Sequence, residues 1–229
     1  MKARLISYSQ PTDIIGVDDI QDLIAFSARV SNPSNQMNKA TNDKLLNYLM
    51  KHKHWSPFEM VSACVEIDTT RDIARQILRH RSFSFQEFSQ RYADPVKELN
   101  MAVTTECRLQ DSKNRQNSIE IEDSDERAAL THEWIKAQSE VILAAKRAYE
   151  FAIDKGIAKE VARKVLPEGL TSSRLYVNGT IRSWIHFIEL RSANGTQKEC
   201  TEVALACAQA ISKIFPMIKG FTNEKIIKY

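Results

Sequence analysis

The sequence predicts an α+β fold, in which helices flank a central, mostly antiparallel sheet. Three short stretches are typical of strands, and the clearest of them alternates apolar with polar residues. Longer stretches repeat apolar residues every three to four positions, which is typical of helices with one buried face. The two kinds of stretch do not alternate as regular strand–helix–strand units, so a doubly wound parallel sheet is disfavoured.

In the first 80 residues we expect two strands and three helices. In chain order these are a strand at 3–8, helices at 18–30 and 41–51, a strand at 61–68 and a helix that continues to the RHR sequence. The second strand carries the apolar–polar alternation, so one side of it is expected to be buried. Thr41 or Asn42, and then Thr69 or Thr70, are the expected N-caps, because their side-chain oxygens accept bonds from free backbone N–H groups.

The rest of the chain begins with a loop-rich region and then becomes helical. Residues 92–125 are polar and weakly periodic, so we expect loop with short extended pieces. The strongest helical pattern follows, with apolar residues recurring from Leu130 through Trp134 to Phe151, and Gly156 ends it. Beyond it we expect a short helix at 158–165, a strand at 171–177, a turn at Gly179, a helix with Ile181 and Trp184 inward, and a last helix at 197–216.

The composition is that of an ordinary globular protein, and it disfavours several classes of function. The 229 residues are 43% hydrophobic and 27% charged, which predicts one domain over residues 1–229. No apolar run approaches the roughly 20 residues that cross a bilayer, so we expect a cytoplasmic protein without membrane contact. The four cysteines lack metal-site spacing, and no metal is expected. A formal net charge of +3 argues against a dedicated nucleic-acid coat.

The stretch RHRSFSFQEFSQR, residues 79–91, carries the strongest chemical signal. Arg79 and Arg81 flank His80 and concentrate positive charge there. Such a cluster suits a phosphate or an anionic ring, because guanidinium groups stay ionised and donate paired hydrogen bonds. Taken alone, three basic residues are more often a solvated helix end.

An extended backbone over the second half of this stretch would point Glu87, Ser89 and Arg91 to one side, where they can line a pocket wall. Ser89 invites the interpretation of a covalent nucleophile. No histidine or lysine stands beside it to remove its proton, so a substrate-contacting hydroxyl is the better hypothesis. The phenylalanines of the stretch are expected in the core, together with Trp134 and Trp184.

The order RHR, seven residues, Ser, one residue, Arg resembles the signature of the flavin-dependent thymidylate synthases. Further blocks resemble the same family in family order: ARVSN (28–32), KHKHWSPFE (51–59), EVARKVLP (160–167) and the segment 179–191 with RSWIHFIELR. The likeness spans most of the chain. It implies the family's fold and its activity, which is the FAD-dependent reductive methylation of dUMP to dTMP. The implied co-substrates are 5,10-methylenetetrahydrofolate as carbon donor and NADPH as reductant.

The resemblance also implies which residues form the site. The implied dUMP-binding positions are Gln76, Arg79, Glu87, Phe88, Ser89, Gln90, Arg91, Arg163 and Arg191. The implied FAD-binding positions are His54, Ser56, Glu59, Arg79, His80, Arg81, Glu87, Thr180, Ile181, Arg182 and His186. Arg191 and Ser89 are the candidate catalytic residues. Arg191 takes the position with which the family promotes loss of the uracil ring proton.

One geometric feature bears on assembly. Arg182 and Arg191 are nine residues apart, so on a straight helix with about 3.6 residues per turn they project to nearly opposite faces. If both contact ligands, the simplest hypothesis is a symmetric oligomer with active sites between subunits, as the family's homotetramers imply.

Two alternatives from other classes remain open at this point. Arginines interleaved with Phe83, Phe85, Phe88 and Tyr92 suit a single-stranded nucleic-acid binding module, because bases stack on aromatic rings. The other alternative is a flavin oxidoreductase of a different kind, since flavin binding alone does not establish uracil methylation.

Overall fold

The computed structural model describes residues 1–13, 16–99 and 102–222. The strands are β1 (Lys2–Tyr8), β2 (Ser62–Thr70), β3 (Ser84–Glu87), β4 (Leu109–Gln110), β5 (Ser118–Ile119) and β6 (Ser172–Thr180). The α-helices are α1 (Ile20–Ala28), α2 (Asn42–Lys51), α3 (Arg71–Ile77), α4 (Pro95–Glu98), α5 (Ser124–Asp154), α6 (Lys159–Ala162), α7 (Ile181–Arg191) and α8 (Lys198–Ile211). Short 3₁₀ helices are η2 (Pro33–Asn35), η3 (Lys39–Thr41), η4 (Ser56–Glu59), η5 (Arg163–Val165) and η6 (Pro216–Phe221).

The central sheet has the strand order β1-β2-β6-β3, and every neighbouring pair in it is antiparallel. β2 and β6 form its middle, and their pairing runs without interruption from Ser62 opposite Thr180 to Thr70 opposite Ser172. β4 and β5 pair only with each other. The predicted α+β fold with an antiparallel sheet is therefore confirmed.

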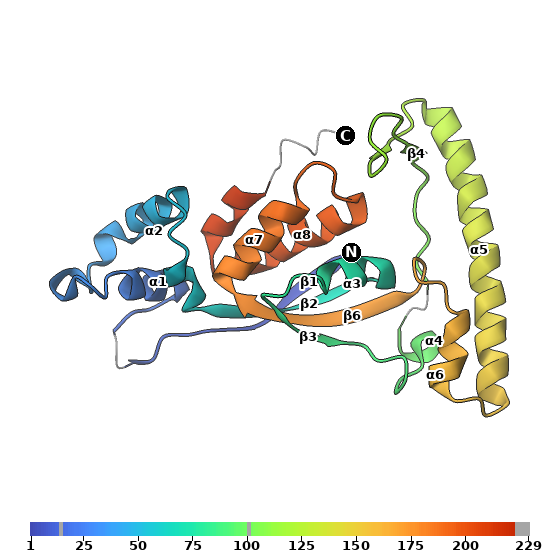
Figure 1. Cartoon of the computed structure of the whole chain (residues 1–229), viewed down its shortest axis with the longest axis horizontal. Helices are drawn as coiled ribbons and strands as arrows, with labels where there is room; N and C mark the ends of the chain where they lie inside the picture. The colour runs from blue at the N-terminus through green and yellow to red at the C-terminus, as the bar shows by residue number, and fades with distance from the viewer. Residues whose placement is uncertain (14–15, 100–101, 223–229) are drawn as a thin grey trace.

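Helices α7 and α8 cover one face of this sheet (Figure 1). The side chains of Val65 and Ile67 on β2 are fully buried in the core on that face, as the alternating pattern predicted. Trp184 of α7 is also fully buried, and its indole nitrogen donates a 2.9 Å hydrogen bond to the carbonyl of Ala63. Because a buried indole N–H needs an acceptor, this bond helps to set how α7 lies on the sheet.

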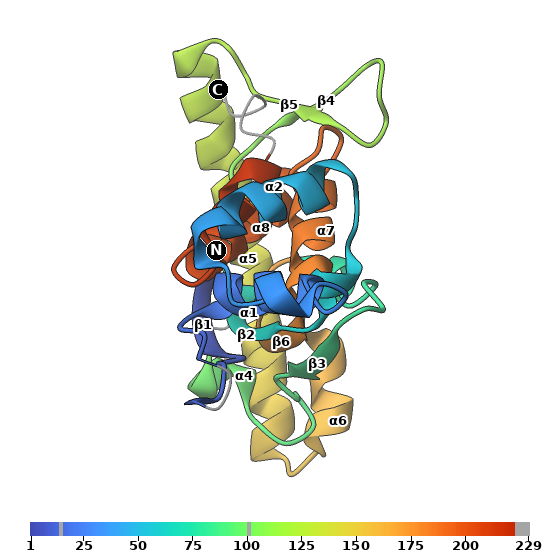
Figure 2. The same cartoon turned by 90° about the vertical axis from the view of Figure 1, so that its left-hand side faces the viewer.

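The long helix α5 stands at one end of the molecule, and α1 and α2 lie at the other (Figure 1). Figure 2, viewed from the end with α1 and α2, shows α5 behind the sheet. α5 packs on the rest of the chain through Tyr149 and Ala152, which contact Ala162 of α6. Nearer its N-terminus, Trp134 and Val141 border a cavity of about 400 Å³ instead.

The prediction that Trp134 is a core residue is therefore wrong, since its side chain is 46% exposed. The helical pattern is correct, but α5 is held away from the body at this level. What joins it to the body there is Gln138, which exchanges two 2.9 Å hydrogen bonds with the backbone of Thr105.

Two further expectations are corrected. Gly179 does not form a turn, because it lies inside β6 opposite Ala63. A Cβ at this position would lie 2.3 Å from Cδ1 of Phe83, so only glycine leaves room for the ring. The last long helix ends at Ile211 rather than near Pro216, because the chain turns there and buries Phe215.

The predicted N-cap positions are correct, although their side chains act differently. Thr41 and Thr70 precede α2 and α3, but neither accepts a cap hydrogen bond from the helix backbone. The hydroxyl of Thr41 instead accepts a 3.0 Å bond from Arg29. This bond ties the end of α1 to the start of α2.

Three features of the structure bear on membrane insertion, metal binding and disulfide formation. In the part of the chain that the structure describes, no helix combines the length and apolar character that a bilayer crossing requires. The same residues contain no group of three or more side chains placed to hold a metal ion. All four cysteines are free thiols, and Cys200 and Cys207 are fully buried.

Candidate functional site

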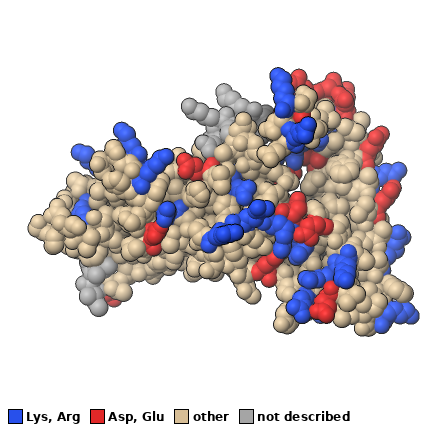
Figure 3. All heavy atoms as spheres, viewed as in Figure 1, with Lys and Arg blue, Asp and Glu red and all other residues tan. Residues whose placement is uncertain are grey.

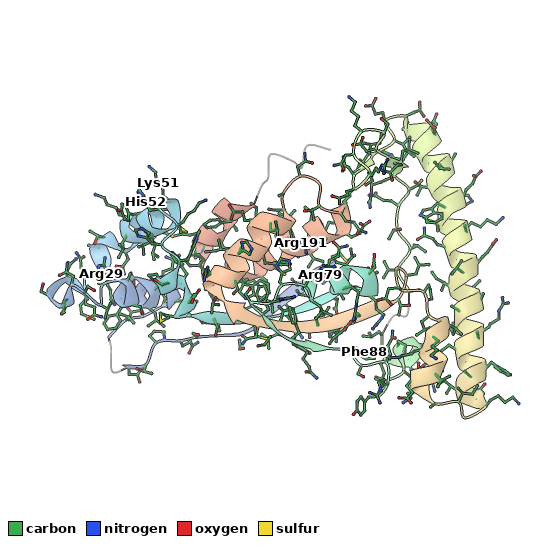
Figure 4. All side chains as sticks on the ribbon, viewed as in Figure 1. Arg29, Lys51, His52, Arg79, Phe88 and Arg191 are labelled. Carbon is green, nitrogen blue, oxygen red and sulfur yellow. The ribbon has the colours of Figure 1, made fainter. Side chains whose placement is uncertain are left out.

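Arg191 is the last residue of α7, and its side chain lies against the end of α3. Its Nε donates a 2.9 Å hydrogen bond to Nε2 of His80, and its Nη2 donates a 3.1 Å bond to the carbonyl of Gln76. The amide of Gln76 in turn donates a 2.8 Å bond to Gln197. Arg79 directly precedes His80 in the chain and is exposed, and Figure 4 labels it between α3 and α7. The structure thus brings the predicted residues Gln76, Arg79 and Arg191 together.

His80 is the buried member of this cluster. Its side chain packs edge-on against Phe187, with the ring centroids 5.0 Å apart. Burial lowers the pKa of His80 to about 4, and the charge of Arg191 and the neighbouring imidazole of His186 act in the same direction. His80 is therefore neutral at pH 7, so its Nε2 accepts the bond from Arg191. The guanidinium of Arg191 is thus held through Nε and Nη2, which are only some of its hydrogen-bond donors.

Glu87, the last residue of β3, is a second centre of charge. Its carboxylate accepts a 2.9 Å bond from the hydroxyl of Ser173 and hydrogen bonds from Arg75, and Arg71 lies 3.6 Å away. Glu168 pairs with both arginines as well. Arg71 and Arg75 were absent from the predicted site. The available signal was their four-residue spacing, which places them on one helical face with Arg79.

The predicted row of Glu87, Ser89 and Arg91 is wrong. β3 ends at Glu87, and the backbone then turns, because Tyr92 and Ala93 both donate their N–H groups to the carbonyl of Ser89. The hydroxyl of Ser89 also accepts a 3.4 Å bond from the N–H of Arg91. A serine that bonds the backbone two residues ahead favours a turn over a continued strand.

The second half of the motif lies with α6. Arg91 pairs with Glu160 at 3.1 Å, and Arg163 begins η5 directly after α6. Gln90 is buried, and its side-chain nitrogen has no hydrogen-bond partner among the described residues. Figure 4 shows Phe88 beside α4, apart from Arg79 and Arg191. Within one chain, the predicted dUMP-binding residues thus fall into two groups.

Several predicted flavin-binding residues line one cavity of about 500 Å³ at the start of α7. Its lining residues are Lys53, Trp55, Glu59, Ser82, Arg182, Ser183, Ile185, His186 and Glu189. Glu59 and Arg182 form an ion pair here. This cavity combines cationic side chains with the apolar surfaces of Trp55 and Ile185, a combination that suits a ligand with both rings and anionic groups.

Of the other predicted flavin-binding residues, His80 and Glu87 belong to the two clusters described above, Arg79 and Arg81 are exposed, and the rest lie on the segments that border this cavity. Ser56 begins η4, and the exposed ring of His54 contacts Tyr48 and His52. Thr180 is the N-cap of α7, where its hydroxyl accepts a 3.2 Å bond from the N–H of Ser183. The side chain of Ile181 is fully buried. Thr180 and Ile181 therefore set where α7 begins.

Arg182 and Arg191 have separate surroundings, as helix geometry predicted. Arg182 pairs with Glu59 at the cavity, whereas Arg191 contacts His80 and Gln76 at the other end of α7. Lys and Arg atoms gather in the middle of the face that Figure 3 shows, with Asp and Glu atoms beside them. Figure 4, drawn from the same direction, labels Arg79 in that area. Because acidic atoms lie beside the basic ones, this face has no continuous positive surface, which suits a small anion better than a long polyanion.

A larger cavity, of about 570 Å³, lies between the segment 103–108 and residues at the ends of β1, β2 and β6. It contains none of the predicted site residues. Its wall includes Arg108, which pairs with Glu199 at 2.5 Å and with Glu106 at 2.8 Å. These ion pairs attach the loop region to the start of α8.

Residues 5–217 match the family described as "Thymidylate synthase complementing protein". A "Flavin-dependent thymidylate synthase" of Synechocystis sp. is 46% identical over 224 residues, which cover 95% of this chain and 97% of the relative. A "Probable flavin-dependent thymidylate synthase" of Paramecium bursaria Chlorella virus 1 is 46% identical over 218 residues, with the same coverage.

Among solved structures, the UMP/dUMP methylase PolB of Streptomyces cacaoi, bound with 5-Br dUMP, has a TM-score of 0.74 at 24% identity. The match covers 96% of this chain and 93% of that one, and it shows that the folds agree. The matched family region contains the RHR motif, both groups of predicted dUMP-binding residues and the cavity at α7. The chain therefore belongs to the thymidylate synthase complementing protein family, the flavin-dependent thymidylate synthases.

Proposed function

We propose that the residues around Arg191 bind dUMP and that the cavity at the start of α7 takes part in binding FAD. The activity is that of the family, namely reductive methylation of dUMP to dTMP with 5,10-methylenetetrahydrofolate and NADPH. Family membership decides against the nucleic-acid module and against an unrelated flavin oxidoreductase. The observation that carries the residue assignment is the hydrogen bonding of Arg191 to His80 and Gln76, beside Arg79.

Arg191 is suited to stabilise negative charge on a uracil ring. The ring carbon that is methylated is a poor nucleophile unless negative charge builds on the ring. A fixed guanidinium stabilises that charge as it forms, and it does so without reorganising, because its position is already set by neutral His80 and by Gln76. We assign to Ser89 and Arg163 contacts with the nucleotide rather than a covalent step.

The residues at the α7 cavity fit the cofactor. FAD carries a flat ring system and a pyrophosphate, and the cavity combines Trp55 and Ile185 with Lys53 and Arg182. When bound, the flavin would accept a hydride from NADPH and, in its reduced form, would supply a hydride to the carbon taken from the folate. We assign phosphate contacts to the exposed Arg79 and Arg81, and Arg81 directly precedes Ser82 of the cavity wall. We assign to Glu59 and His186 the role of orienting the ring system.

We further propose a homotetramer with active sites shared between subunits. Two observations support it: one chain separates its dUMP-binding residues into two groups, and Trp134 and Val141 of α5 line an open cavity. Exposed apolar surface of this kind marks contacts between proteins. Light scattering tests the assembly, because Trp134→Glu should yield a smaller species, whereas His132→Glu on the exposed side of the same helix should not. A monomeric and fully active wild-type protein would contradict the tetramer.

We also propose that residues 1–229 form one domain and that the protein acts in the cytoplasm. The main hydrophobic core contains residues from β1 to η6, which supports one folding unit. The proposed substrates and product are charged nucleotides and folates, which supports the location.

The activity is tested by anaerobic incubation of the FAD-loaded protein with dUMP, 5,10-methylenetetrahydrofolate and NADPH. Chromatography should detect dTMP with the wild-type protein. The amount should fall to background with Arg191→Ala and stay at the wild-type level with Arg115→Ala, which removes an exposed arginine from the β4–β5 loop. An Arg191→Ala variant that forms dTMP at the wild-type rate would refute the role of Arg191.

A further inference from the structure

The segment that joins α2 to η4 closes its helix with a specific backbone motif. The N–H of Lys53 donates to the carbonyl of Met50, and the N–H of His54 donates to the carbonyl of Leu49. This pair of bonds is the Schellman motif, which requires a left-handed residue at the first position after the C-cap. Lys53 occupies that position, with φ of 57°.

Lysine is an unfavourable residue at this position. The left-handed conformation brings Cβ close to the backbone, a penalty that glycine avoids. Among the described residues, Lys53 is the only non-glycine residue with positive φ. Residues held in such backbone conformations cluster at functional sites, which points to a function for the side chain of Lys53.

The side chain of Lys53 lies at the α7 cavity. The cavity has two carboxylates in its wall, Glu59 and Glu189. Glu59 is paired with Arg182. Within the described part of the chain, Lys53 forms no ion pair. Lys53 thus contributes positive charge to the wall of a cavity that Trp55 and His186 also line.

We propose that Lys53 binds a phosphate group of a dinucleotide held at this cavity, and that this contact is the reason for a lysine at the left-handed position. The inference rests on the proposed flavin-binding role of the cavity. Two dinucleotides have the required phosphate groups: FAD carries a pyrophosphate, and NADPH carries several phosphates. Lys53 acts as a binding residue and not as a catalytic one.

Three variants separate the charge from the backbone penalty. Lys53→Gly removes both, Lys53→Met removes the charge alone, and Lys51→Met removes a neighbouring exposed lysine that is not part of the cavity wall. Melting of the apoprotein reports the backbone penalty. Flavin fluorescence titration gives the affinity for FAD. The dependence of anaerobic flavin reduction on NADPH concentration, measured at saturating FAD, gives the affinity for NADPH.

Lys53→Gly should raise the melting temperature by about 2–4 °C, and Lys53→Met should not. Both variants should weaken either FAD or NADPH about tenfold, because a charge-assisted contact is lost. Which titration moves identifies the dinucleotide, and Lys51→Met should move neither. Unchanged affinity for both ligands in both Lys53 variants would overturn the inference while leaving the flavin site intact. A wild-type protein that fails to bind FAD at all would instead overturn the proposed function on which it rests.

Discussion

The neutral state of His80 makes the stability of the fold depend on acidity. The unfolded chain binds a proton on this residue near pH 6.5, whereas in the folded protein burial and Arg191 lower the pKa to about 4. Between these two pH values the unfolded state binds more protons, so acidification favours unfolding. The shift of the pKa by roughly 2.5 corresponds to a loss of at most about 3 kcal/mol, fully developed near pH 4.

The measurement is urea denaturation at several pH values between 4 and 8, with the wild-type protein and with His80→Gln. Glutamine can accept a bond from Arg191 but does not titrate, so the difference between the two curves isolates His80. The wild-type protein should lose more unfolding free energy than the variant from pH 6.5 downward. His132→Gln, which removes an exposed histidine, should follow the wild-type curve. Identical slopes for wild type and His80→Gln would refute the neutral, buried His80.

Three further predictions follow from packing and charge. Gly179→Ala should lower the free energy of unfolding by about 1–3 kcal/mol, because its Cβ meets the ring of Phe83, whereas Gly169→Ala, with open space around it, should be nearly neutral in thermal melting. Glu87→Gln should cost about 1–3 kcal/mol, since two arginines lose their shared carboxylate, and a melting temperature equal to that of the wild type would contradict this. The thiol of Cys207 should resist thiol reagents until the protein unfolds, because burial raises its pKa, and rapid labelling of the native protein would show otherwise.

The sequence predicted the parts of the fold that are governed by local pattern. Alternation over the strand β2 predicted its buried side, because a sheet with one covered face requires that pattern. The long helix α5 was also predicted, but the burial of Trp134 was not, because periodicity identifies an apolar face without showing what packs against it. Gly179 was taken for a turn, because the ring of Phe83 that requires it is distant in the sequence.

The candidate site was predictable where a motif carries it and not where tertiary contacts build it. The RHR motif predicted a role for Arg79, and the similarity of the segment 179–191 to the family predicted one for Arg191. The hydroxyl that supports Glu87 belongs to Ser173, which is 86 residues away and becomes a neighbour only when β3 pairs with β6. No local pattern predicts such a contact. The turn at Ser89 was missed for a different reason. The hydroxyl of Ser89 accepts a bond from the N–H of Arg91, and the alternation of residues in the motif does not reveal this bond.

The most direct test of the dUMP site is calorimetric titration of the FAD-loaded protein with dUMP. We predict that Arg191→Ala weakens binding at least about tenfold relative to the wild type, because a charge-assisted bond to the nucleotide is lost. Arg115→Ala, on the exposed β4–β5 loop, should bind as the wild type does. Equal dUMP affinity in Arg191→Ala and the wild-type protein would contradict the placement of the nucleotide at the end of α7.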